Sequence, residues 1–68
     1  MPIFARNKLR GTIQQLVLGN VMAHVVFRVG ENVIESVITR RSAEELKLTQ
    51  GDTVTAIIKA TEVMIQTD

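Results

Sequence analysis

Residues 21–29, with the sequence VMAHVVFRV, decide the fold class, because apolar side chains recur there at every second position. Strict alternation with a period of two is typical of a β-strand with one face on a core. The first face is wholly apolar and is the predicted core face: Val21, Ala23, Val25, Phe27 and Val29. The second face is half apolar and holds Met22, His24, Val26 and Arg28. In an antiparallel sheet, such an outer face indicates partial cover by another subunit.

Strand-like segments flank this one on both sides. Residues 9–18 are rich in strand-forming residues and end at Gly19-Asn20, a pair that favours a tight turn, so we predict a hairpin with residues 21–29. A turn at residues 30–32 leads into a third predicted strand, residues 33–40. Both faces of this strand are apolar, with Ile34 and Ile38 on one and Val33 and Val37 on the other.

A short helix and two further strands complete the predicted order. The sequence Ser42-Ala43-Glu44-Glu45 matches a capping box, which predicts a helix with Ser42 as N-cap and Glu45 reaching back to the Ser42 amide. Residues 53–59 and 62–66 are the fourth and fifth predicted strands. The resulting class is all-β with one short helix, in the element order of an OB-like five-stranded β-barrel. A small barrel or sandwich of another topology has the same periodicity and is the alternative.

The composition predicts one domain that assembles with copies of itself. A chain of 68 residues buries too small a core to be very stable alone. It has no cysteine and one histidine, which excludes disulfides and thiolate sites and argues against a structural zinc site. Since 46% of the residues are hydrophobic, more than a small barrel can bury, we expect subunit contacts to cover the remainder.

Charge, aromatic content and the absence of certain motifs argue against several kinds of partner and against catalysis. A formal net charge of +1 and only two aromatic residues, both phenylalanine, argue against a nucleic-acid partner. The sequence contains no apolar run long enough for a membrane span and no signal-peptide pattern, so we expect a cytoplasmic protein without a membrane partner. It also lacks paired carboxylates or a nucleophile with a base at a recognisable spacing, so we predict no catalytic residue and no enzyme activity.

Two segments far apart in the chain predict a site for an anion. Residues 3–11, IFARNKLRG, place three cations, an amide and a glycine among apolar residues. Near the other end, residues 58–65, IKATEVMI, place Lys59 at a break between two apolar runs. Cations and backbone amides of this kind suit an oxyanion, which accepts hydrogen bonds but donates none.

Three stretches resemble the Mop domain family, also called molbindin or molybdenum-pterin-binding proteins. They are ARNKLRG at residues 5–11, VITRRSAEEL at residues 37–46 and KATEVMI at residues 59–65. The resemblance implies a single Mop domain over residues 1–68 that assembles as a hexamer, a trimer of dimers. It also implies that molybdate or tungstate binds between the subunits and that the free domain is an intracellular store of the oxyanion. It implies no organic cofactor.

A tetrahedral dianion needs converging donors and needs carboxylates to be kept away. The candidate donors are the side chains of Arg6, Thr39, Ser42 and Lys59 and the backbone amides of Ala5 and Ala60. By resemblance these residues correspond to the ligands of the family, with Arg6 and Lys59 of one subunit facing Thr39 and Ser42 of its neighbour. None of them is expected to ligate a metal cation directly.

One departure from the family pattern supports an alternative function. The family has a serine before Ala-Arg-Asn, and this chain has Phe4, whose ring cannot donate a hydrogen bond. The alternative is therefore a Mop-fold scaffold or interaction module whose anion site is weakened or lost. A third hypothesis is a nucleic-acid-binding OB domain, which the charge and the scarcity of aromatic residues disfavour.

Overall fold

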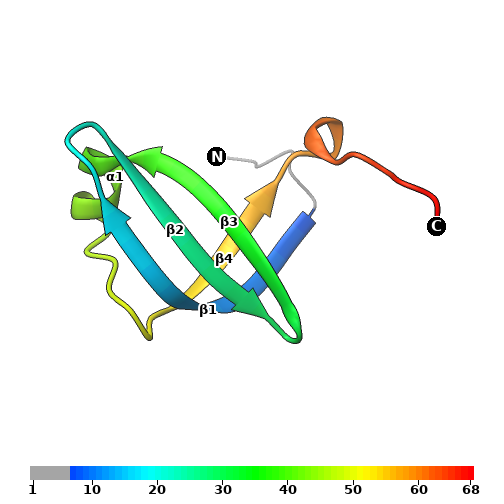
Figure 1. Cartoon of the computed structure of the whole chain (residues 1–68), viewed down its shortest axis with the longest axis horizontal. Helices are drawn as coiled ribbons and strands as arrows, with labels where there is room; N and C mark the ends of the chain where they lie inside the picture. Colours follow the sequence, from blue (N-terminus) through cyan, green and yellow to red (C-terminus); the bar gives the residue numbers. More distant parts are fainter. Residues whose placement is uncertain (1–6) are drawn as a thin grey trace.

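The computed structural model describes residues 7–68, which form a strongly curled antiparallel sheet with a short helix at one end (Figure 1). The elements in chain order are β1 (Asn7–Leu18), β2 (Met22–Val29), β3 (Asn32–Thr39), α1 (Arg40–Glu45), β4 (Thr53–Ile58) and the 3₁₀ turn η1 (Ala60–Glu62). The order of strands in the sheet is β3-β2-β1-β4. Every pair is antiparallel, and β3 and β4 are the two edges.

The long strand β1 causes the sheet to curl. Its first half pairs with β4 and its second half with β2. A register shift between Ile13 and Gln15 marks a bulge, and bulges bend the strand that contains them. Just before the bulge, a Cβ atom built on Gly11 would lie 2.3 Å from the carbonyl oxygen of Arg28. Glycine is therefore needed for β1 and β2 to approach this closely at the bend.

The core lies inside the curl. Its buried members are Ile13, Ala23, Val25, Phe27 and Ala43. Half-buried side chains from all four strands, together with Leu48 after α1, pack against the cluster of Ile13, Val25 and Phe27. The predicted core positions Ala23, Val25 and Phe27 are confirmed, and Val29 is half-buried.

Val21 is wrongly predicted as a core residue, because its side chain is 72% exposed. The strand begins one residue later, at Met22, and Val21 belongs to the preceding turn. In that turn the amide of Gly19 donates to the carbonyl of Met22 at 2.8 Å. Because Val21 lies in this turn and not in the strand, its side chain does not follow the alternation of core-facing and outward-facing residues that the sequence predicts.

The outer face of the sheet exposes several apolar side chains, among them Val17, Met22, Val33 and Val37. His24 lies among them, with its Nε2 atom 2.6 Å from Oε1 of Glu35. The mixed outer face of β2 is thus located as expected. Its cover by another subunit stays a prediction.

The helix begins earlier than the capping-box pattern indicates. Thr39, not Ser42, is the N-cap: its backbone is extended, with φ −70° and ψ 148°, and its hydroxyl accepts from the Ser42 amide at 3.1 Å. Glu45 pairs with Arg41 instead of reaching back to Ser42. The capping-box prediction is wrong because a threonine at the end of β3 provides the same cap three residues earlier. No helix within residues 7–68 is long and apolar enough to cross a membrane.

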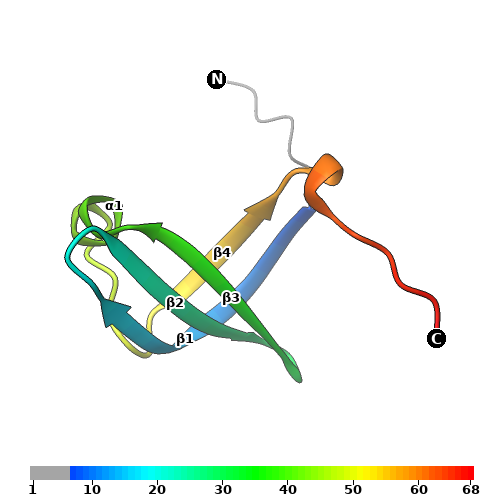
Figure 2. The same ribbon diagram turned by 45° about the horizontal axis from the view of Figure 1, so that its top comes forward.

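The fifth predicted strand, residues 62–66, is not formed in this chain. After β4 the amide of Glu62 donates to the carbonyl of Lys59 at 2.9 Å, closing the turn η1. The segment that follows projects away from the sheet (Figure 2), with Met64 95% and Ile65 90% exposed. A strand requires a neighbouring strand for its hydrogen bonds, and the projecting segment has none within residues 7–68. The described chain is mostly β with one short helix, but its sheet has four strands.

Candidate functional site

Two of the predicted donors form a hydroxyl pair where β3 meets α1. Thr39 accepts from the Ser42 amide, and its own hydroxyl donates to Ser42 Oγ at 2.8 Å. Because Ser42 Oγ receives that proton, its own O–H is left to donate to an external acceptor. Thr39 is exposed and Ser42 is half-buried, so the pair faces outward from a fixed position.

A second pair of predicted donors lies where β4 meets η1. Lys59 is exposed and extended, with φ −65° and ψ 140°, and it precedes the first residue of the turn, Ala60. The carbonyl of Lys59 already accepts a hydrogen bond from the backbone amide of Glu62. Amides in the first turn of a helix have no partner inside it, and within residues 7–68 the Ala60 amide donates to no other backbone group. The arrangement places one cation beside one backbone donor.

The two donor pairs are not brought together within one subunit. Figures 1 and 2 show α1, which follows Thr39, at one end of the molecule and η1, which follows Lys59, at the other. The remaining predicted donors, Ala5 and Arg6, and also Phe4, lie outside the residues that the structure describes. Within residues 7–68 of one chain, the predicted donors therefore make two half-sites.

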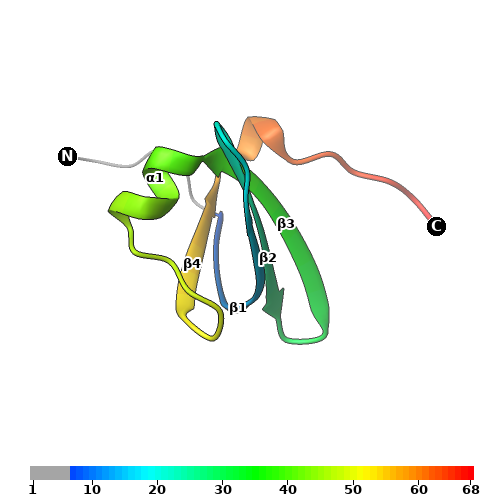
Figure 3. The same cartoon turned by 60° about the vertical axis from the view of Figure 1, so that its left-hand side comes forward.

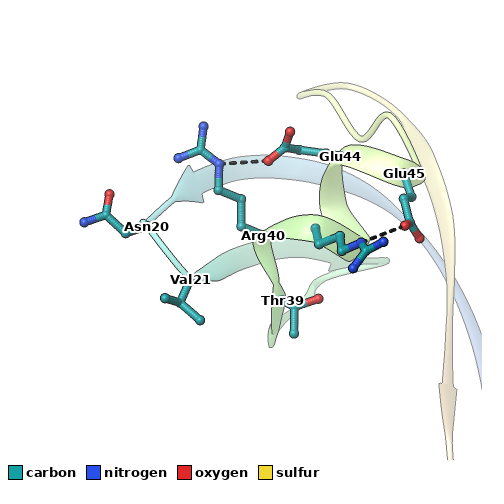
Figure 4. Close-up of a pocket in the computed structure, with 7 residues that line it drawn as sticks. Asn20, Val21, Thr39, Arg40, Glu44 and Glu45 are labelled. Carbon is teal, nitrogen blue, oxygen red and sulfur yellow. Dashed lines mark hydrogen bonds and ion pairs between the residues drawn. The ribbon is translucent and has the colours of Figure 1, made fainter.

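Thr39 also borders an open hollow of about 620 Å³ between α1 and the β1–β2 turn (Figure 4). Its lining consists of Asn20, Val21, Thr39, Arg40, Arg41, Glu44 and Glu45. Ser42 is absent from this lining, although its amide is bound to Thr39.

The charges around this hollow cancel in pairs. Arg40 Nε lies 2.9 Å from Glu44 Oε1, and Arg41 Nε lies 3.3 Å from Glu45 Oε1. Two carboxylates in the lining would repel a dianion, so the hollow by itself is a poor anion site. Both cation–carboxylate pairs have i,i+4 spacing, which stabilises the helix surface modestly.

The sequence reasoning did not single out Arg40, which ties α1 to the adjacent turn. Its Nη1 donates to the carbonyl of Gly19 at 3.2 Å, and its amide donates to the carbonyl of Val21 at 2.8 Å. The i,i+4 spacing of Arg40 and Glu44 is the sequence signal that could have identified the side-chain pair. The contacts to the turn depend on tertiary structure and have no sequence signal.

The described residues suit an anion better than a metal cation. Residues 7–68 contain no group of three or more histidine or acidic side chains able to hold a metal ion. The donors at the two half-sites are hydroxyls, an amide and an ammonium group, which bind oxyanions through hydrogen bonds and charge.

Comparison with known proteins identifies the family. Residues 4–65 match the model of the TOBE domain, and this range is nearly the whole chain. The chain belongs to the TOBE domain family. This TOBE domain is 46% identical over 66 residues to molybdenum-pterin-binding protein 1 of Clostridium pasteurianum, a match that covers 96% of this chain and 97% of the relative.

Solved structures agree with that assignment. The TOBE domain described here matches a molybdate-binding protein from Sporomusa ovata with a TM-score of 0.94 and 40% identity, covering 98% of this chain and 100% of the other. It matches the cytoplasmic molybdate-binding protein ModG with a TM-score of 0.81 and 34% identity, over 88% of this chain and 43% of ModG. The predicted resemblance to the Mop, or molbindin, family is confirmed, and so is the OB-like fold class.

Proposed function

We propose that this TOBE domain binds molybdate, or the similar dianion tungstate. It serves as an intracellular store that buffers the concentration of the free oxyanion. The observation that carries the proposal is the match along the whole chain to a solved molybdate-binding protein, at 40% identity. The donor chemistry of Ser42, Thr39 and Lys59 supports the same ligand class. Sulfate has the same charge but is smaller, so selectivity would come from the spacing of the donors.

The oxyanion site lies between subunits. In one chain the hydroxyl pair of Thr39 and Ser42 is remote from Lys59 and Ala60, so neither half-site surrounds a tetrahedral ligand (Figures 1 and 2). Contact between the two kinds of half-site on neighbouring subunits would assemble a full set, to which Ala5 and Arg6 also contribute. We propose a hexamer, a trimer of dimers, and the exposed apolar side chains of the sheet supply surface for such contacts.

The function we propose is binding without catalysis. The relatives are described as binding proteins, and ModG is described as cytoplasmic, which supports a cytoplasmic role here. The chain acts as one Mop domain over residues 1–68, with the oxyanion and copies of itself as its partners. No organic cofactor, nucleic acid or membrane takes part.

Phe4 favours a second candidate, a Mop-fold scaffold with a weakened or lost anion site. The family pattern has a serine hydroxyl at this position, and Phe4 offers no donor. The scaffold would retain its assembly and would not respond to molybdate.

Equilibrium titration with molybdate, using sulfate as the control, separates these two functions. The storage function predicts saturable binding of molybdate by the wild-type protein and little response to sulfate. The Phe4→Ser variant should then bind at least as tightly. If only the variant binds molybdate, the scaffold function is correct and the storage function is wrong.

A further inference from the structure

The hydroxyl pair of Thr39 and Ser42 has a fixed hydrogen-bond direction. Figure 3 shows β3 leading directly into α1, so the two residues lie on one continuous stretch of backbone. The Ser42 amide donates to Thr39 Oγ1 at 3.1 Å, and the Thr39 hydroxyl donates to Ser42 Oγ at 2.8 Å. Thr39 therefore uses its proton inside the pair. The Ser42 proton has to take a direction that points away from Thr39.

Other polar groups near the pair do not take up this proton. The carbonyl of Ser42 already accepts from the Leu46 amide at 3.0 Å. The carboxylates of Glu44 and Glu45 pair with arginines and line a hollow whose lining does not include Ser42. Within residues 7–68 the Ser42 hydroxyl donates to no other protein group. Its O–H is thus held ready for an acceptor from outside.

The opposite half-site also consists of donors. The ammonium group of Lys59 can donate hydrogen bonds and has no lone pair with which to accept one. The amide of Ala60 is a donor too, and it binds no other backbone group of the described chain. A site built from both half-sites therefore presents N–H and O–H protons from two sides. Such a site suits a tetrahedral anion whose oxygens all accept.

A proton on the anion itself is the feature that such a site would detect. Molybdate, sulfate and selenate carry no proton near neutral pH, whereas phosphate and arsenate still carry at least one. That proton needs an acceptor, and where it faces the Ser42 O–H it meets another donor. A buried donor without an acceptor costs free energy. Protonated tetrahedral anions should therefore bind more weakly than their size and charge alone would predict.

We propose that Thr39 is a positioning residue that fixes the Ser42 hydroxyl as a donor, so that the site admits fully deprotonated tetrahedral oxyanions and rejects those that carry a proton. Thr39 itself does not contact the anion. This selection rests on the proposed oxyanion function and deepens it, because it names a property that the ligand must have.

A double-mutant cycle tests whether Thr39 acts through Ser42. Thr39→Val replaces the hydroxyl by a methyl group of similar size. We expect it to weaken molybdate binding roughly threefold to tenfold, and Thr39→Ser to retain wild-type affinity. In a Ser42→Ala background, adding Thr39→Val should change the affinity no further. An additional loss in the double variant, or no loss in Thr39→Val alone, would overturn the role of Thr39.

Competition by a matched pair of anions tests the selection. Selenate and arsenate have similar sizes and, at mildly alkaline pH, the same charge, but only arsenate carries a proton. Selenate should displace molybdate roughly tenfold better than arsenate in the wild type and in Thr39→Ser. In Thr39→Val this ratio should shrink, because the freed Ser42 hydroxyl can turn and accept. Equal competition in the wild type, or an unchanged ratio in Thr39→Val, would overturn the selection.

Titration of the wild type with molybdate separates this failure from failure of the proposed function. A wild-type protein that does not bind molybdate contradicts the storage function, and the selection falls with it. A protein that binds molybdate but is displaced equally by selenate and arsenate keeps the storage function and loses only the selection.

Discussion

Thr39 and Ser42 share one hydrogen-bonded pair, but the loss of each hydroxyl has a different consequence. The Thr39 hydroxyl accepts from the Ser42 amide and caps α1, so Thr39→Ala should lower the free energy of unfolding by about 1 kcal/mol. The Ser42 hydroxyl is not the cap. Ser42→Ala keeps the backbone amide that donates to Thr39 and should have little effect on stability.

Molybdate affinity should respond more strongly to Ser42. A hydrogen bond to a charged group contributes about 1.5–3 kcal/mol, so Ser42→Ala should weaken binding roughly tenfold or more. Thermal unfolding measures the stability of Thr39→Ala and Ser42→Ala, and titration with molybdate measures their affinity. Thr39→Ser is the control, because its hydroxyl can still cap α1. If the Ser42→Ala variant binds molybdate with wild-type affinity, Ser42 does not contact the anion.

Gly11 is a second single residue with a defined structural role. A Cβ atom at this position would lie 2.3 Å from the Arg28 carbonyl oxygen, a backbone atom that cannot move without disturbing β2. We expect Gly11→Ala to destabilise the fold by about 1–3 kcal/mol or more. Urea unfolding at fixed protein concentration measures this, with the exposed neighbour Thr12→Ala as control. Equal stability of the two variants would contradict the close approach.

At the scale of elements, period-two alternation predicted the strands well because burial on the sheet enforces it. Residues 21–29 identified β2 and most of its core side chains, and the observed start at Met22 differs by one residue. The helix start was misassigned because Thr39 and Ser42 both satisfy the local capping rule, and only the end of β3 selects between them. The local sequence alone therefore does not determine which of the two residues is the N-cap.

The fifth strand shows a different limit of sequence reasoning. Residues 62–66 have strand-like composition, yet composition does not supply the neighbouring strand that a β-strand needs for its hydrogen bonds. In the single chain η1 directs the segment away from β4. The sequence also predicts Thr39, Ser42 and Lys59 as candidate donors, but only the fold shows that they lie in two separate half-sites of one chain.

At the scale of the whole molecule, a site shared between subunits predicts that two defective chains restore each other. Ser42→Ala chains keep Lys59, and Lys59→Ala chains keep Ser42. Neither variant alone should bind molybdate well, because every interface lacks one donor. A mixed assembly, refolded together, should regain binding at the interfaces where an intact Lys59 meets an intact Ser42.

The mixture is compared by titration with each variant refolded alone, and the total subunit concentration is held equal. Recovery of a fraction of the wild-type sites supports the interfacial location. If the mixture binds no more than the average of the two separate variants, Ser42 and Lys59 do not share an interfacial site.

Native mass spectrometry tests selective oxyanion storage in one experiment, because it reports the assembly and its bound anions together. The wild-type protein is measured with molybdate, and again with sulfate at the same concentration. We expect a hexamer that gains several discrete molybdate masses and gains none from sulfate. A hexamer that stays unchanged in molybdate, or that gains sulfate equally, would contradict selective oxyanion storage.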